Sequence, residues 1–164
     1  MARKQPIELF MPPNMLKAKV GGGTGGPDMA AMQRAEAAME ELQSEFSDWI
    51  AQDVKILTAA RARYAATPDR EARAALLRAA HDIKGQAPTY SYPLIARVAA
   101  SLSRMIGELP DVAAIPLNLI DAHVTAIQVI HKNAMKDSGN KTAQTLCAEL
   151  DARVDEILGG AKTS

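Results

Sequence analysis

Apolar residues recur at three- and four-residue intervals along most of the chain, which is the spacing of an α-helix that buries one face. From Asp28 onward this pattern predicts helical structure over about residues 29–66, formed either by one long helix or by two shorter ones. We interpret its methionines as adaptable core residues. The apolar positions of this stretch are Met29, Met32, Ala35, Met39, Leu42, Phe46, Trp49, Ile50, Leu57, Ala60 and Tyr64.

The segment TPDREA predicts the start of the next helix, with Thr67 as N-cap and Pro68 at the first helical position. This helix should run to about Ala87, because Pro88 lacks a backbone N–H and clashes with the preceding turn.

Three further helices follow from the same periodicity: one from about 91–93 to Pro110, one over about 116–136, and one over about 141–158 with Gly159–Gly160 as its stop. No strand pattern appears and the connections are short. We therefore expect an all-α fold, an antiparallel up-down four-helix bundle with additional N- and C-terminal helical segments. The bundle domain would span 29–158, with a core of about 45–136 and a short tail over 159–164.

Residues 1–28 differ from the rest. The segment GGGTGG is typical of a flexible linker, and it lacks the Lys and Ser or Thr of a phosphate-binding loop because Pro27 and Asp28 follow. Ahead of it, apolar residues cluster on both sides of Pro12 and Pro13 between Ile7 and Leu16. This tail is either an unstructured extension or a short docking segment.

Charge and composition narrow the classes of function. Lysine plus arginine and aspartate plus glutamate both number 19, so no net field attracts nucleic acid or an anionic membrane. No apolar run is long enough for a membrane span or a signal peptide. The single cysteine, Cys147, fits a reducing compartment and the core of the last helix. We expect a cytoplasmic protein.

His81 stands out on the predicted helix 67–87. At 100° per residue it lies about 160° from Ile83, the centre of the apolar stripe, and therefore points away from the core. Lys84 and Arg78, one turn on either side, would share this outer face and neutralise a phosphoryl group on the ring. Ala74 and Gly85 leave the ring open to another molecule. Leu77 adds apolar surface for a partner.

The segment HDIKGQA, His81 to Ala87, resembles the core motif of histidine-containing phosphotransfer (HPt) domains. The resemblance covers about residues 45–136. Gln86 replaces a usual serine, Ser91 stands where the family has a later glycine, and Pro88 lies between them.

The resemblance implies a phosphocarrier of a multistep His–Asp phosphorelay, most often monomeric. His81 would be the phosphoacceptor, Lys84 the charge partner of the phosphate, and Gly85 the source of steric clearance. Ala74, Leu77, Arg78 and Gln86 would contact the partner, a receiver domain of a response regulator or of a hybrid histidine kinase. The receiver would bring the aspartate and Mg²⁺, so no cofactor or metal of the chain's own is expected, and the carrier is not an enzyme.

Two alternatives stay open. HDIKG is also similar to the histidine box of sensor kinases, and Asp82 supplies the acid that follows the histidine there. No nucleotide-binding motif follows, so this hypothesis is a dimeric kinase-like phosphotransferase without an ATP domain. The other alternative is a helical adaptor that is never phosphorylated.

The remaining histidines do not suggest a metal site. His123 and His131 lie eight residues apart, about 12 Å along one helix, too far to share one ion. The phase of the helix places His131 on the apolar stripe, where we expect it to be a hydrogen-bonded residue of the core or of the bundle end.

Overall fold

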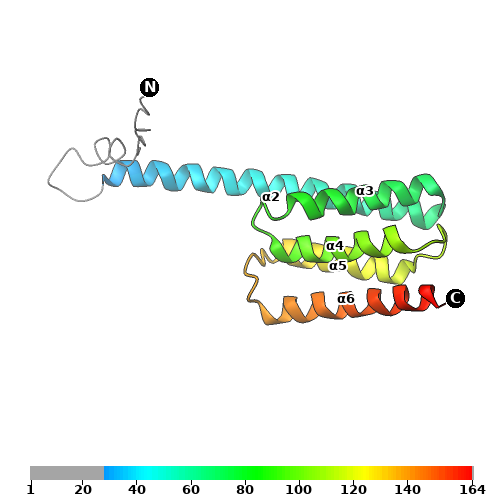
Figure 1. Ribbon diagram of the computed structural model, residues 1–164. Helices are drawn as coiled ribbons and strands as arrows, with labels where there is room; N and C mark the ends of the chain where they lie inside the picture. Colours follow the sequence, from blue (N-terminus) through cyan, green and yellow to red (C-terminus); the bar gives the residue numbers. More distant parts are fainter. Residues whose placement is uncertain (1–27, 164) are drawn as a thin grey trace, which may run out of the picture. The chain divides into compact units, whose positions relative to one another are not determined.

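The computed structural model describes residues 28–163, and Figure 1 shows that this part of the chain is helical. The helices are α2 (Met29–Ala66), α3 (Arg70–Gln86), α4 (Pro93–Glu108), α5 (Leu117–Lys132) and α6 (Lys141–Lys162). No strand occurs between residues 28 and 163. The all-α class expected from the sequence is therefore confirmed. The proposed docking segment in the N-terminal tail lies outside the described residues.

The chain divides into two units, residues 1–42 and residues 43–164. Helix α2 is continuous from Met29 to Ala66, so the single-helix alternative holds. The interpretation of its methionines as core residues is wrong, because Met29, Met32 and Met39 are all exposed. The first fully buried residue of α2 is Ile50, and Phe46 before it packs partly buried against the core.

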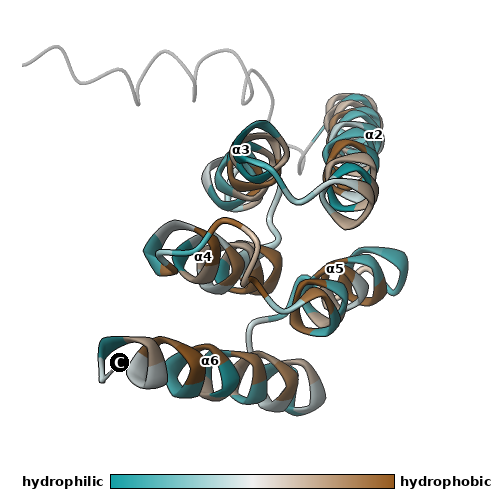
Figure 2. Cartoon of the chain, turned by 90° about the vertical axis from the view of Figure 1, so that its right-hand side faces the viewer, coloured by the Kyte–Doolittle hydropathy of each residue, from teal (hydrophilic) through white to brown (hydrophobic). Residues whose placement is uncertain are grey.

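In the second unit, α4 packs against α3, α5 and α6, and α5 also contacts α6. Figure 2 views α3 and α4 more nearly along their axes and shows α4 between α3 and α6. The C-terminal part of α2 is tied to α5 by the Arg61–Asp121 ion pair and to the connection before α5 by a hydrogen bond from the Tyr64 hydroxyl to the Val112 carbonyl, 2.7 Å long. The largest fully buried aliphatic residues are Ile50, Leu57, Leu76, Ile83, Ile95, Leu102, Ile106, Ile120, Ile127 and Ile130.

The start of α3 differs from the prediction. Asp69, and not Thr67, is the N-cap, and its carboxylate accepts a hydrogen bond of 2.8 Å from the Ala72 N–H. Thr67 still donates its N–H to the Arg63 carbonyl and so completes the last turn of α2. The end of α3 agrees with the prediction, since the helix stops at Gln86, before Pro88.

Two other helix ends were predicted wrongly. Helix α6 continues through Gly159 and Gly160 to Lys162, and the Thr163 hydroxyl donates a hydrogen bond to the Gly160 carbonyl at this end. Helix α5 ends at Lys132 and does not reach 136, because Ala134 adopts a left-handed backbone conformation with φ 48°.

Candidate functional site

His81 lies on the exposed side of α3. The opposite side of the helix is buried, with Ala72, Leu76 and Ile83 completely inaccessible to solvent. His81 itself is exposed, as are Arg78 and Lys84. The prediction from helical periodicity that His81 points away from the core is therefore confirmed.

The surroundings of His81 are open. Ala74 and Gly85 are exposed, and Leu77 is half-buried against the core. A Cβ atom added to Gly85 would meet nothing within 4 Å. The glycine is thus not needed for packing among the described residues, and the clearance it gives would matter to a molecule that approaches α3 from outside them.

The polar atoms at this site have no partners within the described part of the chain. Between residues 28 and 163, neither the His81 ring nor the side-chain nitrogens of Lys84 and Arg78 form a hydrogen bond or an ion pair. An imidazole and two cations are therefore available to bind something from outside.

A groove of about 300 Å³ runs between α2 and α3 beside this face. Arg78 and Asp82 line it from α3, and Ile56 and Arg63 line it from α2. Ile56 is half-exposed. The sequence reasoning missed Ile56, although its place one residue before the core position Leu57 already puts it at the edge of the apolar stripe.

Asp53 is a second residue of this region that the sequence reasoning missed. Burial raises the pKa of its carboxyl group, and the negative charge of Asp82 raises that pKa further. Its Oδ2 atom is buried without a hydrogen-bond partner among the described residues. An acid within the apolar stripe of α2 was the signal that would have revealed it.

The exit from α3 is held by side chains around Tyr90. The Tyr90 hydroxyl donates a hydrogen bond of 3.0 Å to Oε1 of Gln86, and its ring lies 5.3 Å from that of Phe46 and 5.9 Å from that of Trp49. The sequence predicts that Gln86 contacts a partner protein. In the structure its side chain also accepts a hydrogen bond from Tyr90 of the same chain.

Ser91 completes this exit with φ 65°, the left-handed conformation that favours glycine. Ser91 stands where the HPt motif, which the sequence resembles, has a glycine. Its backbone has the conformation that a glycine adopts most easily.

The other two histidines differ in burial. His123 is completely buried, with Nδ1 2.7 Å from the Leu119 carbonyl and Nε2 3.2 Å from the Ser101 hydroxyl. Burial lowers its pKa. His131 is only half-buried, and its ring contacts that of Tyr92. His131 is therefore not a core residue; it lies in the last turn of α5, where the alternative of a bundle-end position would place it.

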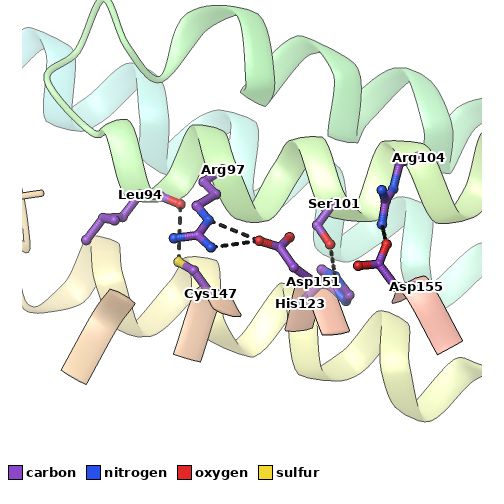
Figure 3. A network of polar contacts seen from close by, with 8 residues as sticks. All are labelled: Leu94, Arg97, Ser101, Arg104, His123, Cys147, Asp151 and Asp155. Atoms are coloured by element: carbon purple, nitrogen blue, oxygen red, sulfur yellow. Dashed lines mark hydrogen bonds and ion pairs between the residues drawn. The ribbon is translucent and has the colours of Figure 1, made fainter. Parts of the chain in front are cut away.

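Figure 3 shows the polar contacts that join α4 to α6 around His123. Arg97 binds Asp151 at 2.9 Å, and Arg104 binds Asp155. Cys147 is buried between these helices, as expected for a core residue, and burial raises the pKa of its thiol. These groups are already paired or packed, which makes them structural.

Among residues 28–163 no group of three or more His, Cys, Asp or Glu side chains is arranged to hold a metal ion. No helix in the same range is both long and apolar enough to cross a membrane. Comparison with protein-family models, with curated proteins and with solved structures found no match to this chain.

Proposed function

We propose that this protein is a histidine phosphocarrier of a multistep His–Asp phosphorelay and that His81 is its phosphoacceptor. The observation that carries the proposal is an exposed imidazole on α3, free of intramolecular partners in the described chain, with Lys84 and Arg78 one turn away on either side. The HDIKG motif, the open space at Gly85 and the glycine-like backbone of Ser91 add support.

The proposed chemistry is a reversible transfer between an aspartate of a receiver domain and His81. A neutral ring nitrogen attacks the phosphorus of the receiver's acyl phosphate, the new N–P bond forms, and the O–P bond breaks to leave the aspartate as a carboxylate. The other ring nitrogen keeps its proton. A second receiver aspartate then takes the phosphoryl group by the reverse of these steps, and His81 is regenerated.

Lys84 and Arg78 would stabilise the negative charge of the phosphoryl group during transfer. Mg²⁺ would arrive on the receiver together with its aspartate, so the carrier would need no cofactor of its own. In this proposal each chain accepts one phosphoryl group from one receiver and passes it to another. The chain is therefore a stoichiometric carrier and not an enzyme.

The proposal includes an antiparallel four-helix bundle built from the C-terminal part of α2 with α3, α4 and α5, and α6 as an addition. Its support is the packing of α4 on α3 and α5, together with the links from α2 to α5 through Arg61 and Asp121. Such a bundle would present His81 from the outer face of one rigid helix.

Transfer from a panel of phosphorylated receiver domains tests the proposal. Wild-type chain should acquire an acid-labile, alkali-stable label, and His81→Gln should acquire none. His131→Gln is the matched control, because it removes another partly accessible histidine from a different helix. Label that persists in His81→Gln, or absence of label with every receiver, would contradict the proposal and favour the helical adaptor.

A further inference from the structure

The connection from α3 to α4 is held in one conformation by contacts within the second unit. The Ser91 N–H donates to the Pro88 carbonyl at 3.1 Å, and the Tyr92 N–H donates to the Ala87 carbonyl at 2.9 Å. Between these two bonds, Ser91 keeps its left-handed backbone with φ 65°. A conformation of this kind persists only where the surrounding structure fixes it, and such positions are frequent at functional sites. The connection is therefore a fixed part of the surface at the end of α3.

Tyr90 is the side chain that ties this connection to both neighbouring helices. Its ring is nearly buried and lies against the rings of Phe46 and Trp49 on α2. Its hydroxyl donates a hydrogen bond to Oε1 of Gln86, the last residue of α3. All four residues belong to the second unit. The group that holds the Gln86 side chain is thus itself held by packing.

The hydrogen bond from Tyr90 leaves one half of the Gln86 amide free. Gln86 is exposed, and its Nε2 atom has no partner among residues 28–163. This nitrogen carries two N–H donors. Because the bond at Oε1 restricts rotation of the amide, binding an acceptor to these donors costs little side-chain entropy. The amide is therefore prepared to bind an acceptor from outside the described chain.

Gln86 lies close enough to His81 to contact the same partner. The two residues are five positions apart on α3, which places them about 7.5 Å apart along the helix axis and about 140° apart around it. At a side-chain radius of about 5 Å, the two positions are separated by about 12 Å. A specific protein interface covers about 800 Å² on each partner, which is a patch of about 16 Å in radius. A partner centred on the His81 ring therefore extends far enough to reach Gln86.

We propose that Gln86 donates its amide hydrogens to an oxygen acceptor on the receiver domain and that Tyr90 is the positioning residue that holds the amide for this contact. The inference rests on the proposed function, because that function requires the receiver as partner. The HPt motif that the sequence resembles has a serine at this position, and a serine side chain is shorter and has no amide. The contact would therefore help to determine which receivers this chain accepts.

Initial rates of phosphotransfer, measured over a range of concentrations of one phosphorylated receiver, test the role of the amide. Gln86→Ala should raise the receiver concentration at half-maximal rate by about 3- to 10-fold, because one hydrogen bond to the receiver is lost. The rate at saturation should stay the same, because the reacting atoms are on His81. Gln86→Glu keeps an acceptor for the Tyr90 hydroxyl but has no N–H donor, so it should be impaired at least as strongly as Gln86→Ala.

Tyr90→Phe tests the positioning role, because it removes the hydroxyl and keeps the aromatic packing. It should raise the receiver concentration at half-maximal rate by about 2- to 5-fold in the wild-type background and should have no further effect in Gln86→Ala. Gln128→Ala is the matched control. Gln128 is an exposed glutamine of α5 whose amide bonds the Thr58 hydroxyl, and its loss should leave transfer unchanged.

The outcomes separate this inference from the proposed function. If no receiver labels His81, the proposed function is overturned and this inference with it. If His81 is labelled and Gln86→Glu behaves as wild type, the amide donors have no role and only this inference is overturned. The same holds if Gln86→Glu is impaired and Gln86→Ala is not, because charge repulsion would then explain the effect. A Tyr90→Phe variant with wild-type concentration dependence would overturn the positioning role of Tyr90.

Discussion

Asp53 on α2 and Asp82 on α3 face the same interface, where burial raises the pKa of Asp53 and the charge of Asp82 raises it further. The carboxylate of Asp53 is thus a source of instability at neutral pH. Asp82 directly follows His81 in the sequence. The two carboxyl groups that repel each other therefore lie next to the candidate site.

We expect Asp53→Asn to stabilise the protein at pH 7 by about 0.5–1 kcal/mol, since an amide removes the unfavourable charge. An aspartate in the unfolded chain titrates near 3.8, and the folded-state pKa lies above that value. The folded state therefore gains relative stability as pH falls through its own pKa, and the variant's advantage should shrink by pH 4. Urea unfolding at both pH values checks this, and an advantage that is equal at pH 7 and pH 4 would contradict it.

Lys84→Ala should slow phosphotransfer to the chain by about 10- to 100-fold, because a charge-assisted contact to the phosphoryl group is lost. The urea midpoint should hardly change, since Lys84 is exposed and unpaired within the described residues. Single-turnover transfer from one phosphorylated receiver measures the effect. Lys141→Ala, an exposed lysine at the start of α6, is the control and should transfer at the wild-type rate.

Gly85→Ala should separate folding from transfer. Alanine in a helix is favoured over glycine by up to about 1 kcal/mol, and its Cβ would meet nothing among the described residues, so the variant should be more stable than wild type. Under the proposed function, the same methyl group should hinder the approach of a receiver and slow transfer. If the variant were more stable and transferred at the wild-type rate, Gly85 would have no role in clearance.

The buried His123 predicts a decline in stability on mild acidification. The model imidazole value is 6.5, and burial lowers the pKa of His123 in the folded state below it. The unfolded chain therefore binds a proton first, so folding stability falls as pH decreases from about 7.5 toward the folded-state pKa. His123→Gln should cost about 1–3 kcal/mol and remove this part of the pH dependence. His131→Gln should retain it, and a pH dependence unchanged in His123→Gln would refute the assignment.

Ser91→Gly should stabilise the fold by about 0.5–1 kcal/mol, because a left-handed backbone is strained for residues with a Cβ atom. Ser91→Ala keeps the Cβ atom and should be close to wild type. Thermal unfolding of the two variants compares them directly. A destabilised Ser91→Gly would mean that the serine side chain makes a stabilising contact that outweighs the strain.

The sequence was informative where helical periodicity alone decides the outcome. The exposure of His81 followed from its angle to Ile83, and the end of α3 followed from Pro88. Periodicity does not show whether a partner covers an apolar face, so Met32 and Met39 were placed in a core that the described chain does not provide.

Other errors arose where two residues compete for one role or where a distant element changes burial. Thr67 and Asp69 are both good N-caps, and only the last hydrogen bond of α2 decides between them. His123 is buried where its ring meets Ser101 of α4, a contact that the sequence of α5 does not contain. Asp53 was missed for the same reason, since its environment depends on its burial against other helices and on Asp82 of α3.

The aromatic contacts at the exit of α3 have a practical consequence. Trp49 is the only tryptophan of the chain, it is half-exposed, and its ring lies beside Tyr90, which is hydrogen-bonded to Gln86 at the last residue of α3. Indole emission shifts to shorter wavelengths when water is excluded from the ring. The chain thus contains its own fluorophore at the end of the helix that carries His81, and events there can be followed by spectroscopy without an attached dye.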